Sequence, residues 1–212
     1  SALHYTELAL QLKSNLMDYN GGEGVVNANN NAFVRFNPEV IFDTYLPYPS
    51  ALLRGDIDPA LYATYHNNDL RKTMYHRTAT AVGVFRGSYS GYGFLFNGVA
   101  TDELYLMKAE CLARKGDAQE AINTLNMLLV KRFKTGTYLP LVATNAQDAL
   151  GLVLLERRKE MVLRGWRWMD VRRLNKIGAN ITLRRNLDGR EYALAPNAEA
   201  YALPIPEDII NM

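Results

Sequence analysis

Glu156 and Glu160 are the residues of this chain whose types and spacing could do acid–base chemistry. They stand four residues apart, so on a helix both carboxylates lie on one face. Such a pair could act as general acid and general base, as in glycoside hydrolysis. Arginines crowd the same segment, residues 155–173, and a nearby guanidinium holds a carboxylate in its charged form. We therefore favour a structural ion-pair network in which arginines neutralise acids, made of Glu156, Arg157, Glu160, Arg167, Asp170 and Arg172.

Two tyrosine-rich segments could bind a sugar. An aromatic ring covers the apolar face of a pyranose, while neighbouring polar groups take its hydroxyls. One segment is the glycine-rich stretch 86–97, and the other surrounds residues 45–48. The alternative is that these aromatic rings only pin irregular loops onto the body of the protein. The candidate ligand-binding residues are Tyr89, Tyr92, Arg86, Asn97, Tyr45 and Tyr48.

Other kinds of site find little support in the sequence. The three histidines are dispersed and show no metal-binding spacing, and Asp56 with Asp58 supplies too few oxygens for calcium. Cys111, the single cysteine, is expected to be a small packing residue. A glycosidase would require two unpaired carboxylates facing one cleft, which the pattern does not offer. We predict no enzymatic activity, no metal and no cofactor.

Composition and charge also bound the function. A chain of 212 residues with 48% hydrophobic residues can bury a sizeable core. No run approaches the roughly 18 apolar residues of a membrane-spanning helix. Nine arginines between Arg157 and Arg190 could follow a phosphate backbone. The net charge of only +2 and the interleaved acids argue against nucleic acid as a partner.

The elements that must position these residues are mainly helices. The clearest are two in residues 101–134, where Thr101 is expected to cap the first and Gly116 to end it. Asp117 and Glu120 have the spacing of a capping box at the start of the second helix. Apolar residues then recur at intervals of three and four, so one face is buried. This is a helix pair of the tetratricopeptide type.

The remaining segments are expected to alternate between helix and irregular chain. Helices are predicted at residues 3–19, from Asp58, at 145–164 and, beyond Gly165, at 166–174. Loops are predicted at residues 20–37, at 80–98 and in the proline-containing tail, with one strand-like segment at 37–42. The predicted fold is therefore all-α, with long irregular loops and little β structure.

Five segments, in this order, share a pattern with one known family. Three are Asn37–Phe42, the triplet Asp69-x-Arg71 and the stretch from Glu103 to Asp117. The fourth is Glu156-Arg157-Arg158-x-Glu160 followed by Gly165-x-Arg167-Trp168-x-Asp170-x-Arg172-Arg173, and the last is Leu203-Pro204-Ile205-Pro206-x-x-x-Ile209. Together they resemble the SusD/RagB family of nutrient-binding outer-membrane lipoproteins. The resemblance spans residues 37–209.

The resemblance implies a SusD-like fold and a role in nutrient uptake. A protein of this kind binds oligosaccharide at the cell surface and delivers it to a SusC-like TonB-dependent transporter, without catalysis. Family members are usually more than twice as long, so residues 1–212 are expected to be a single C-terminal domain. The membrane anchor, a lipid, would then lie on an N-terminal part outside this sequence. The alternative function is a structural adaptor that holds a protein partner with its helix pair.

Overall fold

The computed structural model describes residues 1–28, 31–47, 57–77, 84–91, 94–202 and 205–210. It divides the chain into two compact units, Ser1–Arg164 and Gly165–Met212, which are treated separately below. The structure is 42% helical and 18% strand, so it is mostly helical as predicted. No helix within the described ranges is both long and apolar enough to cross a bilayer.

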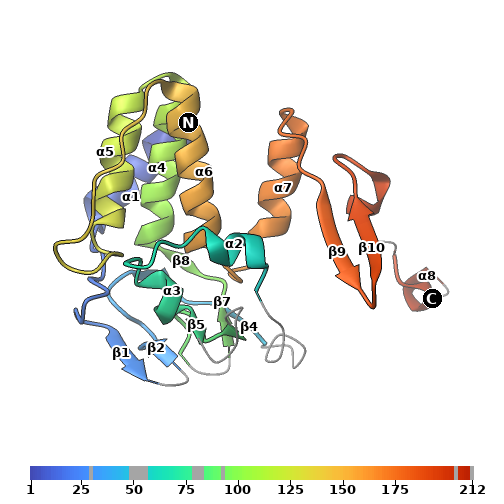
Figure 1. The fold of residues 1–212 in the computed structure, drawn as a ribbon, viewed down its shortest axis with the longest axis horizontal. Coiled ribbons are helices and arrows are strands. Elements are labelled where there is room, and N and C mark those ends of the chain that lie inside the picture. Colours follow the sequence, from blue (N-terminus) through green and yellow to red (C-terminus); the bar gives the residue numbers. More distant parts are fainter. Residues whose placement is uncertain (29–30, 48–56, 78–83, 92–93, 203–204, 211–212) are drawn as a thin grey trace. The chain divides into compact units, whose positions relative to one another are not determined.

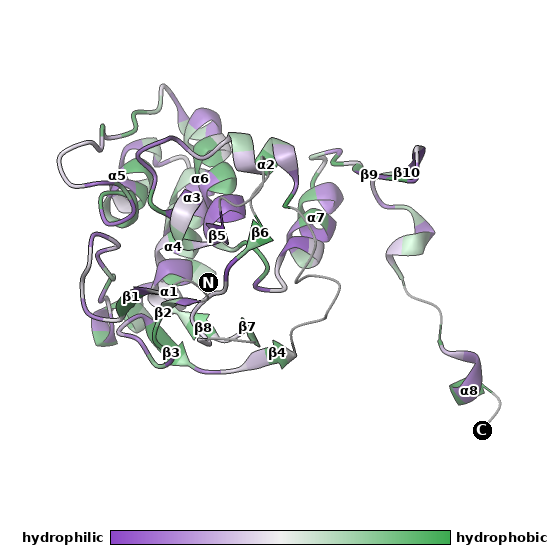
Figure 2. Cartoon of the chain, turned by 60° about the horizontal axis from the view of Figure 1, so that its bottom comes forward, coloured by the Kyte–Doolittle hydropathy of each residue, from purple (hydrophilic) through white to green (hydrophobic). Residues whose placement is uncertain are grey.

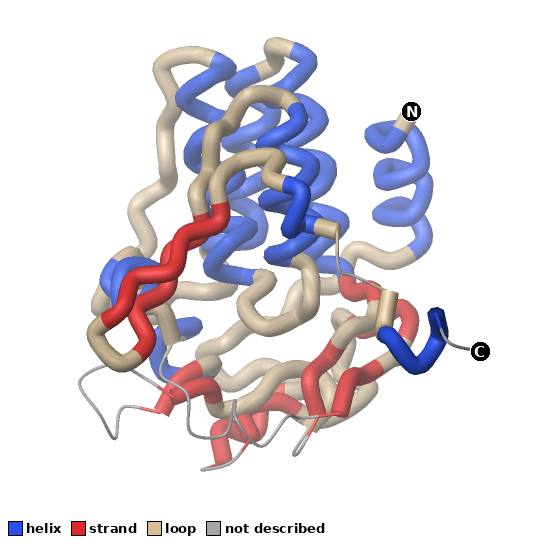
Figure 3. The backbone as a smooth tube through the Cα atoms, turned by 90° about the vertical axis from the view of Figure 1, so that its right-hand side faces the viewer, coloured by secondary structure: helices blue, strands red, loops and turns tan. Residues whose placement is uncertain are grey.

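The first unit has a layer of helices over a layer of short strands (Figures 1 and 3). Helix α4 lies at the centre of the helical layer and contacts α1, α5 and α6. Close approach is possible because Ala109, Ala113 and Ala121 are buried where α4 and α5 meet. The bounds of these helices are Ala2–Leu12 for α1, Thr101–Lys115 for α4, Ala118–Leu129 for α5 and Ala146–Glu160 for α6.

Local capping signals explain where the helix pair begins and ends. Gly116 has φ +100°, the left-handed conformation that ends α4. The side chain of Asp117 accepts a hydrogen bond from the Glu120 backbone at 3.1 Å, which confirms the predicted cap of α5. The predicted Thr101 cap is wrong, because α4 is preceded by Ala100 and the Thr101 hydroxyl donates to the Asn15 carbonyl instead.

The strand layer corrects the all-α prediction. In the described part of the chain the strands form five two-stranded antiparallel sheets, four of them in the first unit. Most of these strands hold only two or three residues, too few to show the alternation by which a strand is recognised in sequence. The pairs are β1 (Val25–Ala28) with β2 (Asn31–Phe33), β3 (Val40–Phe42) with β8 (Val99–Ala100), β4 (Tyr45–Pro47) with β7 (Phe94–Phe96), and β5 (His76–Arg77) with β6 (Val84–Phe85).

Other boundaries also differ from the prediction. The strand-like segment at 37–42 is confirmed as β3, and the helix start at Asp58 is confirmed as α2 (Pro59–Ala63), capped by the Asp58 side chain. A short α3 (Arg71–Met74) follows. The first helix ends at Leu12 and not at residue 19, because the next residues leave it and bury Met17 and Tyr19 in the core.

The core beneath the helices is rich in aromatic rings. It includes Tyr19, Phe33, Tyr75, Tyr89 and Phe96, all of which are almost fully buried. The hydrophobic residues of β3, β6 and β8 are seen in green in Figure 2. Strands therefore supply much of the wall that encloses this core, together with α3 and the chain before β1.

The second unit consists of a helix, a hairpin and a tail. The antiparallel hairpin of β9 and β10 was not predicted, and the tail that was predicted as loop contains a 3-10 helix and α8. Asp188 and Gly189 form its turn with φ of 51° and 78°, and this Asp-Gly pair was the available sequence signal. The elements are α7 (Arg167–Lys176), β9 (Leu183–Leu187), β10 (Arg190–Leu194), a 3-10 helix (Glu199–Tyr201) and α8 (Glu207–Ile210).

Candidate functional site

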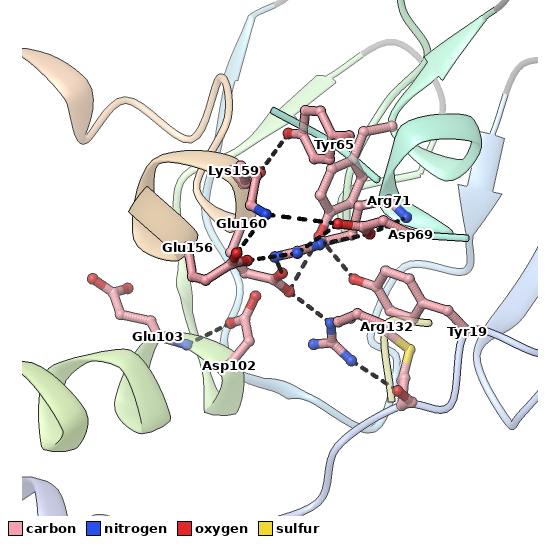
Figure 4. A network of polar contacts seen from close by, with 12 residues as sticks. Tyr19, Tyr65, Asp69, Arg71, Asp102, Glu103, Arg132, Glu156, Lys159 and Glu160 are labelled. Atoms are coloured by element: carbon pink, nitrogen blue, oxygen red, sulfur yellow. Dashed lines mark hydrogen bonds and ion pairs between the residues drawn. The ribbon is translucent and has the colours of Figure 1, made fainter. Parts of the chain in front are cut away.

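A network of buried charges lies where α3 meets α6 in the first unit (Figure 4). The Arg71 side chain is 0% exposed and forms ion pairs with three carboxylates. Its guanidinium lies 2.7 Å from Asp69, 2.6 Å from Glu156 and 2.9 Å from Glu160. Lys159 adds a second cation beside Glu156. Each carboxylate therefore has a charged partner inside the protein.

Arg132 extends the network towards the strand layer. It donates to Glu160 through Nε at 2.8 Å and to Glu39 through Nη2 at 2.8 Å. A third hydrogen bond, from Nη1, reaches the Met17 carbonyl at 2.8 Å, and the guanidinium lies 4.1 Å from the centre of the Tyr19 ring. Arg132 is fully buried, so this side chain ties α6 to the strands and to the chain that follows α1.

The network is suited to holding elements together and unsuited to proton transfer. Burial alone would raise the pKa of Glu160, but Arg132 and Arg71 outweigh burial and lower this pKa to about 2. The Glu160 side chain is 0% exposed, so a substrate does not reach it. Glu156 and Glu160 are thus placed among structural ion pairs.

The cations that bind Glu156 and Glu160 were not among the arginines that the sequence predicted for the network. These two acids are bound by Arg71, Arg132 and Lys159, whereas the prediction named Arg157, Arg167 and Arg172. The place of Arg167 in the network stays a prediction. Arg157 faces Glu103 at 3.5 Å, and Arg172 is exposed. In the second unit, Asp170 pairs with Arg173 at 2.8 Å. The Asp69-x-Arg71 triplet is part of the sequence pattern described above. No sequence signal indicates that it contacts α6 or that Arg132 belongs to the network.

The network predicts an unusual dependence of stability on pH. Burial raises the pKa of Glu39 from 4.5 to about 7, so between these values the folded state holds a proton that the unfolded state releases. Stability should therefore fall as the pH rises through this range. Glu160 has the opposite effect. Because its pKa is lowered, its contribution to the stability of the folded protein is lost as the pH falls from 4.5 towards 2.

Unfolding free energies from urea titrations at pH 5, 6, 7 and 8 would test this. Glu39→Gln should flatten the decline between pH 5 and 7, and Glu207→Gln, at an exposed position, should leave it unchanged. A wild-type stability that climbs steadily from pH 5 to pH 7 would contradict the role given to Glu39.

The candidate ligand-binding tyrosines differ in their exposure to solvent. Tyr89 is only 2% exposed, and its hydroxyl bonds to Glu39 at 2.7 Å and to the hydroxyl of Tyr19 at 2.8 Å. Its ring faces are therefore taken up by the core, and the prediction that it stacks on a sugar is corrected. Tyr45 is 45% exposed on β4. Tyr92 and Tyr48 lie outside the described residues.

The two polar candidates are bound to neighbouring parts of the first unit. Arg86 donates to the Thr73 carbonyl and to the Asn27 side chain, each at 2.9 Å. Asn97 donates through its backbone to Thr44 at 2.9 Å, which places it beside the strand of Tyr45. The structure thus brings Asn97 close to Tyr45 through the pairing of β4 with β7.

Tyr45 is part of an exposed row of flat side chains. We call this row the aromatic strip; it comprises Phe36, Arg35, Tyr45 and Phe94. The guanidinium of Arg35 lies 4.8 Å from the centre of the Phe36 ring and 5.0 Å from that of Tyr45. The Tyr45 and Phe94 rings are 4.4 Å apart. The exposed fractions are 68% for Phe36, 45% for Tyr45 and 38% for Phe94.

Two features of the fold build this strip. The register of β4 and β7 sets Pro47 opposite Phe94 and Tyr45 opposite Phe96, so Tyr45 and Phe94 are diagonal neighbours. Asp43 fixes Arg35 by accepting bonds from Nε at 3.0 Å and Nη2 at 2.6 Å. The sequence did not indicate Arg35, Phe36 and Phe94, because strand pairing brings Phe94 to Tyr45 and the turn after β2 brings Arg35 and Phe36 there.

A hollow of about 500 Å³ adjoins the strip and shares Phe36 with it. Its walls include Lys13, Glu23, Phe42 and Asp43 as well as Phe36. Pockets of a few hundred cubic ångströms are the usual size for small ligands. The surface around Tyr45 therefore combines exposed aromatic rings with a cavity that carries both charges.

Comparison with known proteins identifies the class of protein. The pattern of the SusD family matches residues 102–212, which is more than half of the chain. The chain belongs to the SusD family. It is 37% identical over 113 residues to the SusD-like protein P38 of Formosa agariphila, an alignment that covers 51% of this chain and 21% of that protein.

Solved structures agree on the fold. A SusD-like carbohydrate binding protein from Bacteroides vulgatus matches 99% of this chain and 53% of its own, with a TM-score of 0.61 and 20% identity. A SusD superfamily protein from Bacteroides thetaiotaomicron matches 82% of this chain and 45% of its own, with a TM-score of 0.60 and 16% identity. The chain thus spans about half the length of these relatives and about a fifth of the curated one.

Proposed function

We propose that this chain binds oligosaccharide for uptake at the outer membrane of the cell. In this role it captures the glycan without catalysis and delivers it to a SusC-like TonB-dependent transporter, in a protein held at the cell surface by a lipid anchor. Membership of the SusD family supports the proposal, as does similarity to a structure described as carbohydrate binding. The candidate acid–base pair of Glu156 and Glu160 is buried and ion-paired, which supports a non-catalytic role.

The aromatic strip is the observation that carries the proposal. Sugar rings present apolar faces that pack on flat aromatic groups, and their hydroxyls need polar partners at the edge. The strip offers Phe36, Tyr45 and Phe94 in one exposed row, with Arg35 and Asp43 as polar neighbours. Three aromatic rings side by side can pack against several sugar rings, so they suit an oligosaccharide better than a single sugar.

Tyr45→Ala is expected to weaken oligosaccharide binding by about tenfold, since losing one stacking ring costs on the order of 1.4 kcal/mol. Titration calorimetry against a panel of oligosaccharides would measure the change. Tyr192→Ala is a matched control, because Tyr192 lies in the second unit and is 47% exposed, against 45% for Tyr45. Unchanged affinity in both Tyr45→Ala and Phe94→Ala would show that the strip is not the binding surface.

A structural adaptor is the second candidate function. Met127 in helix α5 is 56% exposed and Val130, its C-cap residue, is 50% exposed, and such apolar side chains can hold a protein partner. The adaptor role predicts that the wild-type chain binds no oligosaccharide of the panel. Binding that depends on Tyr45 would exclude the adaptor as the main role.

A further inference from the structure

We propose that the hollow beside the aromatic strip is a subsite for a neutral, hydroxyl-rich sugar ring and that it selects against acidic sugars. This inference rests on the proposed glycan-binding function and adds the class of glycan. It depends on three features of the hollow: an unpaired carboxylate oxygen, exposed rings around it, and the state of the nearby cations.

The unpaired oxygen belongs to Asp43. The Asp43 side chain is 8% exposed, and both bonds from Arg35 go to its Oδ2 atom. Its Oδ1 atom is buried and accepts no hydrogen bond. A buried acceptor without a donor costs free energy, so a ligand that donates to it gains more than an ordinary hydrogen bond gives. A sugar hydroxyl is such a donor.

The rings around the hollow are suited to a sugar and can adjust to it. Phe36 and Phe42 line the hollow and are 68% and 61% exposed. Exposed side chains change rotamer within nanoseconds, so the walls of the hollow beside Asp43 can adjust to a ligand. Phe36 also has φ 56°, an unfavourable conformation for a bulky residue, and backbone strain of this kind clusters at functional sites.

The cations near the hollow are already engaged. Arg35 is held by Asp43, and the Lys13 ammonium donates to the Val40 carbonyl at 2.7 Å. Glu23 adds a second carboxylate to the lining. The carboxylate of a uronate, or a sulfate group, supplies no donor to Asp43, and the two carboxylates of the hollow balance the two cations, so the lining offers an acidic group no net attraction. A hydroxyl group of a neutral ring can donate to Asp43.

Calorimetry on the full chain would test this selection. The probes are neutral gluco-, xylo- and manno-oligosaccharides, compared with oligogalacturonides and sulfated oligosaccharides of equal length. We expect a neutral oligosaccharide to bind about tenfold or more tightly than any acidic one, which corresponds to about 1.4 kcal/mol.

Asp43→Asn supplies the matched variant, because its amide oxygen can still hold Arg35 while its amide nitrogen turns the free acceptor into a donor. This variant should bind the neutral oligosaccharide more weakly, so the difference in affinity between neutral and acidic oligosaccharides should become smaller. Thermal melting would verify that the variant is folded. Phe42→Ala, at the wall of the hollow, should also weaken neutral binding.

The outcomes separate this inference from the proposed function. If no oligosaccharide binds the wild type, the proposed function fails and the inference fails with it. If oligosaccharides bind through Tyr45 but acidic ones bind as tightly as neutral ones, the function stands and the inference is overturned. The inference is also overturned if Asp43→Asn leaves the ratio of neutral to acidic affinity unchanged.

Discussion

Arg71→Met is expected to lower the free energy of unfolding by about 3–5 kcal/mol, the usual cost of removing one partner from a buried ion pair. The side chain is 0% exposed and forms ion pairs with Asp69, Glu156 and Glu160. Methionine fills a similar space but donates no hydrogen bond, so three buried carboxylates would be left with too little positive charge. Urea unfolding followed by circular dichroism would measure the loss.

Arg158→Met is the matched control, because Arg158 pairs with Asp58 at the surface with 33% and 48% of the side chains exposed. This change should cost no more than about 1 kcal/mol. Equal losses in the two variants would contradict the structural role of the network.

The related change Glu160→Gln should lower stability and leave oligosaccharide affinity intact, because Glu160 is buried and pairs with Arg71 and Arg132, neither of which belongs to the aromatic strip. If affinity vanished while stability held, the assignment of Glu160 to the scaffold would be wrong.

Gly98→Ala is expected to destabilise the first unit by at least about 3 kcal/mol, beyond the usual cost of an overpacked core. An added Cβ would lie 2.0 Å from the Phe42 carbonyl oxygen and 2.8 Å from the Phe96 ring. The carbonyl belongs to β3, so the clash is relieved only by moving β3 away from the chain that leads into β8. Phe42 lines the hollow, so oligosaccharide binding should weaken as well.

Gly151→Ala is a control for which a gain in stability is expected. Gly151 lies within α6, and an added Cβ there would meet nothing within 4 Å. Because alanine favours a helix over glycine by about 1 kcal/mol, this variant should be more stable than the wild type. The two melting temperatures should therefore move in opposite directions, and a Gly98→Ala protein as stable as the wild type would refute the packing described for β3.

The helices could be predicted from the sequence because their signals are local. Gly116 and Asp117 mark the boundary between α4 and α5 through their own backbone and side-chain chemistry. The strands could not be predicted in the same way. Strands such as β5 and β6 hold two residues each and exist only because partners distant in the chain lie beside them.

In the candidate site, too, some residues could be predicted from local sequence and others are brought together only by the fold. Tyr45 could be chosen as an exposed aromatic residue in a polar context, but its neighbours Arg35 and Phe94 reach it only through the fold. Tyr89 stood in an equally suitable sequence and is enclosed by Phe33 and Phe96. Local composition indicates a loop with aromatic rings, and it does not say which ring faces the solvent.

The buried charges also determine when the first unit can become stable during synthesis. Arg71 binds Glu156 and Glu160, which follow it by 85 and 89 residues, and Arg132 binds Glu39, 93 residues before it. Until α6 has been made, Arg71 has only Asp69 and Arg132 has only Glu39 as a carboxylate partner, so the cost of burying these guanidinium groups is offset only in part. Such long-range contacts raise the contact order and slow folding. The helix layer and the strand layer therefore become stable together, late and in one cooperative step.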